Sequence, residues 1–152
     1  MKIAITGNRN LTEADKSLLT QKIKELVSNP QIEKIFFGGA RGADTEALKV
    51  ALAERKTNVI LACVLPNTIE HQPYETREIS RLADEIIELK NEISPNDRFK
   101  AYKIRNEYMI DNADEVVAFW SSDFRSGTYS AINYARKQNK KVEIVEIKGE
   151  DK

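Results

Sequence analysis

Short apolar runs alternate with longer amphipathic stretches along this chain, and the alternation is its main structural signal. Most of the apolar runs are continuous rather than strictly alternating, which is typical of strands in a parallel sheet covered on both faces. The runs predict strands at Lys2–Thr6, Lys34–Phe37, Asn58–Val64, Asp84–Leu89, Glu115–Trp120 and Lys141–Ile147.

The stretches between these runs carry apolar residues at helical spacing. They predict helices at about Glu13–Val27, Ala43–Arg55, Tyr74–Leu82, Asp97–Asn112 and Thr128–Gln138. The first helix has Thr12 as its N-cap with Asp15 three positions on, a variant of the capping box. Strands that alternate with helices predict an α/β fold, a doubly wound, Rossmann-like three-layer sandwich whose mostly parallel sheet has about six strands.

The length of 152 residues fits one domain of ordinary size, predicted at residues 1–147 and followed by a polar tail, residues 148–152. The longest apolar runs, such as residues 59–65, fall far short of the ~20 residues that a membrane-spanning helix needs. The first residues read as a strand rather than as a signal peptide. We therefore expect a cytoplasmic protein without a membrane partner.

The charge balance bears on partners and cofactors. Lys and Arg number 24, Asp and Glu also number 24, and the net charge is zero, which argues against nucleic acid as a partner. Cys63 is the only cysteine and His71 the only histidine, so no metal is expected. The identity of any cofactor and the oligomeric state, homo-oligomer included, stay open.

A glycine-rich loop follows the second predicted strand and leads directly into a helix. Three glycines in five residues permit a close backbone approach to a ligand, and the helix start offers free N–H groups to a phosphate. An arginine in the loop could pair with phosphate, and an aspartate could cap the helix or accept hydrogen bonds from a ribose. A plain strand-to-helix turn is the alternative. The residues are Gly38, Gly39, Ala40, Arg41, Gly42 and Asp44.

Two further loops belong to the same predicted edge of the sheet, where ligands of such folds bind. After the first strand come Gly7, Asn8 and Arg9, and before the fifth helix come Ser126, Gly127 and Thr128. The second group could hold a phosphate or could simply cap its helix. We expect the two helix starts, at residues 42–44 and 126–128, to face a common anion.

The fourth predicted helix carries two polar residues beside its apolar stripe. Asn106 falls on the stripe with Met109, where it either fixes a neighbouring loop or reaches a ligand, and Arg105 lies to one side, solvated or in the crevice. The same spacing places Phe99 and Tyr102 in the core.

These motifs together resemble a known superfamily. Thr6-Gly7-Asn8-Arg9 resembles the T/S-G-S/H-R opening of the SLOG superfamily, which includes DprA-like DNA-processing proteins and LOG-type phosphoribohydrolases. The segment from Gly38 to Asp44 resembles the G-G-A-x-G-x-D loop of its YpsA/YspA-like branch. Arg105-Asn106-x-x-Met109, Ala113-Asp114 and Ser126-Gly127-Thr128 resemble the second half of that branch.

The resemblance implies a Rossmann-like domain that binds a nucleotide or a nucleotide-derived ligand as a sensor or processor. The residues that would line its crevice are Gly7, Arg9, Gly38, Gly39, Arg41, Gly42, Asp44, Arg105, Asn106, Gly127 and Thr128.

Two other functions follow from the same resemblance. Phosphoribohydrolases place a Glu three residues after Gly-Thr to assist N-glycosidic cleavage, and here that position holds Ala131. An N-glycosidase would need another acid, with Asp44, Glu75 and Asp123 as candidates. DprA-like binding of single-stranded DNA is the third hypothesis, and the zero net charge argues against it.

Overall fold

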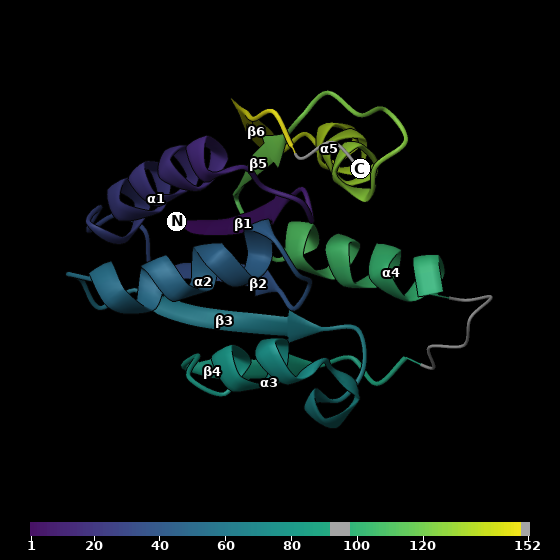
Figure 1. The fold of residues 1–152 in the computed structure, drawn as a ribbon, viewed down its shortest axis with the longest axis horizontal. Helices are drawn as coiled ribbons and strands as arrows, with labels where there is room; N and C mark the ends of the chain where they lie inside the picture. Colours follow the sequence, from purple (N-terminus) through teal and green to yellow (C-terminus); the bar gives the residue numbers. More distant parts are fainter. Residues whose placement is uncertain (92–97, 150–152) are drawn as a thin grey trace.

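The computed structural model describes residues 1–91 and 98–149. Its described strands form one parallel sheet in the order β4-β3-β2-β1-β5-β6 (Figure 1). The strands are β1 (Lys2–Gly7), β2 (Lys34–Gly38), β3 (Ile60–Leu65), β4 (Glu85–Glu88), β5 (Glu115–Trp120) and β6 (Lys141–Glu146). The predicted α/β fold is confirmed, and the sheet is parallel throughout its described strands.

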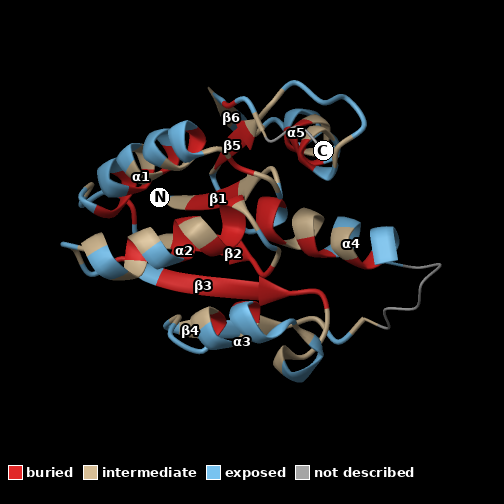
Figure 2. Cartoon of the chain, in the orientation of Figure 1, coloured by how far each residue is buried: buried red, intermediate tan, exposed pale blue. Residues whose placement is uncertain are grey.

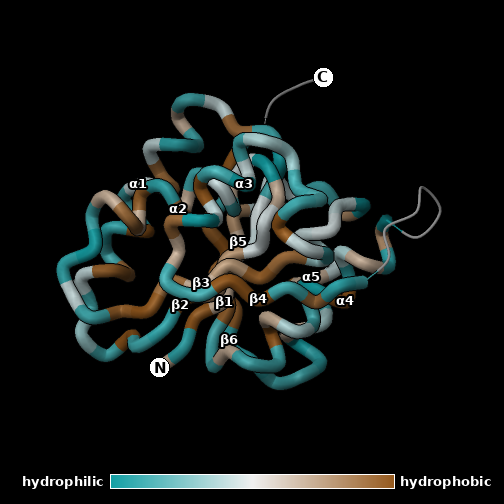
Figure 3. Tube along the Cα trace, turned by 90° about the horizontal axis from the view of Figure 1, so that it is seen from below, coloured by the Kyte–Doolittle hydropathy of each residue, from teal (hydrophilic) through white to brown (hydrophobic). Residues whose placement is uncertain are grey.

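Helices cover both faces of the sheet. Those on one face are α1 (Glu13–Val27), α2 (Ala43–Glu54) and α3 (Tyr74–Ser80), and those on the other are α4 (Arg98–Asp111) and α5 (Gly127–Lys137). A 3-10 turn, η1 (Ile69–His71), precedes α3 and was not predicted. The central strands β1, β2, β3 and β5 carry the buried residues of the sheet, whereas the edge strands β4 and β6 have none (Figure 2). Hydrophobic residues are concentrated along the centre of the sheet (Figure 3).

Two hydrophobic clusters occupy the two faces. Phe37, Leu19 and Ile23 belong to the cluster under α1 and α2. Phe36, Met109 and Ala131 belong to the cluster under α4 and α5. Phe36 and Phe37 are consecutive and point to opposite faces, which is why the buried strands are apolar at successive positions.

The predicted burial of Phe99 is wrong, since its side chain is 83% exposed, whereas Tyr102 is partly buried. The first turn of α4 extends past the carboxyl ends of the strands (Figure 1) and has no sheet beneath it. Apolar residues at helical spacing are buried only where another element packs against that face of the helix. The predicted first residue of this helix, Asp97, lies outside the described residues.

The predicted polar tail is anchored at its start. The backbone amides of Lys148 and Gly149 each donate to the Asp15 carboxylate, at 2.9 Å. Residues 150–152 lie outside the described part, as do residues 92–97 between β4 and α4. No helix within residues 1–91 and 98–149 is long and apolar enough to cross a bilayer.

The chain reverses direction across the sheet beside β1. Strands β1 to β4 are added in one direction, and α4 then returns the chain to β5 on the other side of β1. The loops after β1 and β5 therefore diverge at their carboxyl ends. Open α/β sheets bind ligands at such a switch point.

Candidate functional site

Asn8 joins three elements at the carboxyl edge of the sheet. Its amide donates to the Phe119 carbonyl at 3.0 Å, and its own carbonyl accepts from the amide of Ala43 at 2.9 Å. Its side-chain amide donates to the Ser121 hydroxyl at 2.6 Å. The loop after β1 is thereby tied both to the start of α2 and to the loop after β5.

Two of the predicted ligand-binding glycines allow this close packing. A Cβ on Gly7 would lie 2.5 Å from that of Ala43, and one on Gly42 would lie 2.3 Å from the Arg9 carbonyl oxygen. Gly42 also has a φ of +83°, which other residues rarely adopt. Because the Ala43 amide already donates to the Asn8 carbonyl, that amide at the start of α2 is not free to bind a phosphate.

Two charged side chains meet over the end of β2. A Cβ on Gly38 would lie 2.9 Å both from the guanidinium of Arg105 and from Oδ2 of Asp44. Asp44 is 6% exposed and Arg105 is 4% exposed, so α2 and α4 bring two nearly buried opposite charges to one spot. A side chain at position 38 would displace the Arg105 guanidinium and the Asp44 carboxyl group, so glycine leaves both groups where they are.

Arg105 is held in place from its own helix. Its Nε donates to the Asn106 side-chain oxygen at 2.9 Å, while its Nη1 is buried without a hydrogen-bond partner. The ring of Tyr102 lies against the guanidinium groups of both Arg105 and Arg9, at 5.6 Å and 5.1 Å from the ring centre. Asn106 therefore acts as a positioning residue, and Arg9 joins the cluster from the loop after β1.

The Asp44 carboxyl group is the most perturbed acid of this site. Burial raises its pKa to about 7, against the lowering effects of the Arg105 charge, the Ala40 backbone amide and the Arg9 charge. Its Oδ1 has no hydrogen-bond partner, and neither has the buried Oδ1 of Asn8. The cluster of Arg9, Asp44, Tyr102 and Arg105, called here the Asp44–Arg105 crevice, thus holds one unused acceptor, Asp44 Oδ1, and one unused donor, Arg105 Nη1.

Other predicted site residues face elsewhere. Gly39 packs toward Leu65 and Thr76, since an added Cβ would lie 2.2 Å from Leu65 Cδ2. The Ala40 carbonyl accepts the Thr45 hydroxyl at 2.7 Å, and Arg41 is exposed. Glu75 lies exposed in the first turn of α3, and no described contact joins it to the crevice.

The start of α5 is built as an ordinary helix cap. The Ser126 hydroxyl accepts the Tyr129 amide at 3.1 Å and donates to the Asp123 carbonyl at 2.7 Å. Thr128 is buried, whereas the space beside Gly127 is open. The contacts described here connect the loop before α5 to the first loop only through Ser121 and Asn8, so the common anion of the two helix starts stays a prediction.

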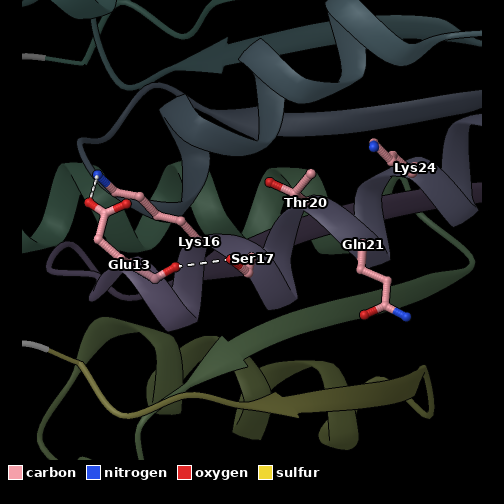
Figure 4. A pocket seen from close by; sticks show the side chains of 6 residues that line it. All are labelled: Glu13, Lys16, Ser17, Thr20, Gln21 and Lys24. Carbon is pink, nitrogen blue, oxygen red and sulfur yellow. Dashed lines mark hydrogen bonds and ion pairs between the residues drawn. The ribbon is translucent and has the colours of Figure 1, made fainter.

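Two surface depressions lie away from this crevice. One, of about 370 Å³, is lined by α1 alone, from Glu13 to Lys24 (Figure 4), and its polar side chains project from one solvated helix face. The other, of about 620 Å³, runs between α4 and α5 past Lys103, Tyr129 and Lys137. Neither contains Asp44 or Arg105.

The sequence pattern did not lead us to predict the contacts of the Tyr102 ring with Arg9 and Arg105. Its assignment to the core followed from its spacing with Phe99, but Arg105 lies three positions further along the same helix face. The i, i+3 relation between an aromatic ring and an arginine was the available signal. The contact with Arg9, a distant loop residue, had no local signal at all.

Known proteins resemble this chain both in sequence and in fold. The chain is 27% identical over 142 residues to the uncharacterized SPbeta prophage-derived protein YoqJ of Bacillus subtilis (strain 168), covering 80% of each. Its fold matches DNA processing protein A of Helicobacter pylori, studied for its single-stranded DNA binding mode, with a TM-score of 0.75 and 24% identity over 95% of this chain.

The fold also matches DNA processing protein A of Streptococcus pneumoniae (TM-score 0.76, 17% identity, 94% of this chain) and a molybdenum cofactor binding protein of Rippkaea orientalis (TM-score 0.68, 19% identity, 94% of this chain). The chain spans 64% of the Helicobacter, 49% of the Streptococcus and 74% of the Rippkaea protein. The family model of DNA recombination-mediator protein A matches residues 1–152. With the Rossmann-like fold and the glycine loops in place, the chain belongs to the DNA recombination-mediator protein A family.

Proposed function

We propose that this protein binds a phosphorylated nucleoside, or a related nucleotide-derived ligand, in the Asp44–Arg105 crevice. The observation that carries the proposal is a pair of buried side chains beside Gly38, those of Asp44 and Arg105, in which Asp44 Oδ1 and Arg105 Nη1 have no hydrogen-bond partner. An unsatisfied buried donor or acceptor costs about 1–3 kcal/mol, and such groups usually have a partner. A ligand that supplies one acceptor and one donor would remove this cost.

A sugar phosphate has the complementary chemistry. Its phosphate oxygens accept from guanidinium groups, and Arg105 and Arg9 both lie on the ring of Tyr102. A sugar hydroxyl donates to the free carboxyl oxygen of Asp44. The position of the crevice, at the carboxyl ends of β1 and β2, agrees with where α/β sheets hold such ligands. The YpsA/YspA-like motif of residues 38–44 supports the same class of ligand.

A thermal-shift panel tests the proposal. Nucleoside mono- and diphosphates and ADP-ribose at millimolar concentration should raise the melting temperature of the wild-type protein, since a ligand that binds only the native state stabilises it. Arg9→Ala should reduce the shift, because it removes one of the two proposed phosphate-binding cations. Arg9 is exposed, so its loss leaves the core intact. Arg136→Ala, an exposed arginine at the far end of α5, is the matched control. Absence of a shift with every compound would refute the proposal.

Binding of single-stranded DNA is a second candidate, favoured by one observation. Phe99 is 83% exposed on α4, among the exposed basic residues Arg98, Lys100 and Lys103. Exposed rings beside basic residues are how sequence-tolerant proteins stack and hold single strands. The structural relative from Helicobacter pylori is described as binding single-stranded DNA. Phe99 was expected in the core, and its exposure makes the ring available for stacking.

Fluorescence anisotropy with a labelled oligo(dT) tests the second candidate. Phe99→Ala should weaken binding by about fivefold or more, given about 1–3 kcal/mol per stacked base. Phe124→Ala, at another exposed phenylalanine before α5 (65% exposed), is the control. Equal losses from both variants would point away from a stacking site at Phe99. Base release is not part of either proposal, because the position that hydrolases fill with Glu is the buried Ala131.

A further inference from the structure

The Asp44–Arg105 crevice contains two cations and one acid that differ in their surroundings. Arg9 is exposed, whereas Arg105 and Asp44 are almost completely buried, and both lie so near Gly38 that a Cβ added there would be 2.9 Å from each. No ion pair within 4.0 Å joins Asp44 to either arginine among the described contacts. The carboxyl group is thus close enough to feel both charges and too far away to be neutralised by a direct salt bridge.

The charged and titratable groups around Asp44 come from three elements. Arg105 on α4 and Arg9 in the loop after β1 favour the ionised carboxylate. The thiol of Cys63 on β3 is coupled to it and is itself buried, with its pKa raised to about 11, so it stays neutral. The α3 helix contributes the uncharged Thr76 at Gly39. Burial acts in the opposite direction and already raises the pKa of Asp44 to about 7.

An anion placed on the two arginines changes this balance. Its negative charge offsets the attraction that Arg105 and Arg9 exert on the carboxylate, while the desolvation of the carboxylate remains or increases. The carboxyl group then takes up a proton, and the side chains of the crevice carry two positive charges. A phosphate monoester is a dianion above its second pKa of about 6 and matches these two charges, whereas a diester carries only one.

We infer that the crevice selects a terminal phosphate monoester, bound as its dianion, and that Asp44 takes up one proton when the ligand binds. This inference rests on the proposed function and narrows it to a class of ligand. It separates a free nucleotide from the backbone of a nucleic acid, because every internal phosphate of a nucleic acid is a diester. The protonated carboxyl group keeps one acceptor oxygen for a sugar hydroxyl and gains one donor.

Titration calorimetry at pH 8 tests the inference. The four 5′-ribonucleoside monophosphates are titrated into the full chain in two buffers of different ionisation enthalpy, and the tightest binder is repeated as its phosphate methyl ester. At this pH the free monoester is already a dianion, so proton uptake reports on the protein. We expect about 0.5–1 proton taken up per ligand and binding at least tenfold tighter than that of the methyl ester.

Two variants assign the proton to its site. Asp44→Asn should bind the monoester with no proton uptake and with no change in affinity between pH 8 and pH 9. Wild-type affinity should fall by up to about tenfold over that unit. Glu54→Gln, at the opposite end of the same helix, should behave as wild type.

The outcomes distinguish the inference from the proposed function. A monophosphate that binds without proton uptake, or no more tightly than its methyl ester, overturns the inference and leaves nucleotide binding standing. Binding of ADP-ribose in the thermal-shift panel without binding of any monophosphate also overturns the inference alone. If no phosphorylated nucleoside of either experiment binds, the proposed function itself fails.

Discussion

The buried carboxyl group of Asp44 makes the stability of the folded protein depend on pH. In the folded protein its pKa is about 7, above its ordinary value of 3.8, because burial outweighs the two nearby arginines. The native state therefore binds more protons than the unfolded state between about pH 4 and pH 7. Stability falls as the pH rises through this range and is constant above it.

Replacing this acid tests that account. Asp44→Asn should remove the pH dependence and be more stable than wild type at pH 8, by up to roughly 4 kcal/mol, since one pKa unit corresponds to about 1.4 kcal/mol. Urea unfolding of both proteins at pH 5 and pH 8 measures the difference. An Asp44→Asn protein less stable than wild type at pH 8 would mean that the carboxylate is paired and ionised in the native state.

Glycines that look alike in the sequence differ in their surroundings. Gly42→Ala should lower the free energy of unfolding by at least about 2 kcal/mol, because its φ is +83° and the new methyl would meet the Arg9 backbone. Gly127→Ala places a methyl group in open space at the start of α5 and should raise stability by up to about 1 kcal/mol. Chemical denaturation of the two variants measures both changes in the free energy of unfolding. Equal effects would contradict the packing described at Gly42.

At the scale of elements, α1 is coupled to the end of the chain through its cap. The predicted capping box is confirmed, with the Thr12 hydroxyl accepting the Asp15 amide and the Asp15 carboxylate accepting the Thr12 amide, both at 3.0 Å. The same carboxylate accepts the amides of Lys148 and Gly149 after β6. Burial alone would raise the pKa of Asp15, but the backbone hydrogen bonds from Lys148, Thr12 and Gly149 together lower it.

Asp15→Ala should therefore cost more than the loss of a helix cap. We expect about 2–3 kcal/mol, against about 1 kcal/mol for Thr12→Ala, because hydrogen bonds to a charged group contribute about 1.5–3 kcal/mol. Since the native pKa lies below the unfolded value, this stabilisation is present above about pH 4 and is lost as the pH falls. Denaturation at pH 7 and pH 3 measures both effects. Similar costs for the two variants would show that the tail contacts add nothing.

The bounds of the elements could be predicted closely because each depends on local signals. The predicted limits of α1 and β5 match the structure. For the other predicted helices and strands, most ends are displaced by one or two residues. The orientation of α4 could not be predicted as well. Its apolar spacing is regular, but whether Phe99 meets a sheet depends on how far the helix extends past β2, which the helix sequence does not record.

For the whole molecule, a net charge of zero limits the electrostatic attraction of nucleic acid. If single-stranded DNA binds beside Phe99 through Arg98, Lys100 and Lys103, log K against log salt should have a slope of about −2.1, from three phosphate contacts at −0.7 each. Anisotropy titrations between 50 mM and 300 mM salt measure the slope. A slope steeper than about −4 would assign binding to a broader basic surface than this turn of α4.

The sequence by itself determined the order of strands and helices, the helix cap and the choice of glycine-rich loops, because hydrophobic period, capping and turn chemistry act over a few residues. It also identified Arg9, Asp44, Arg105 and Asn106 as candidates. Only the tertiary structure decided that Gly7 and Gly42 pack the loops together, that Asn106 orients Arg105, and that Asp44 and Arg105 face each other across Gly38. These relations join residues up to sixty-seven positions apart (Gly38 and Arg105), and burial and charge act through space rather than along the chain.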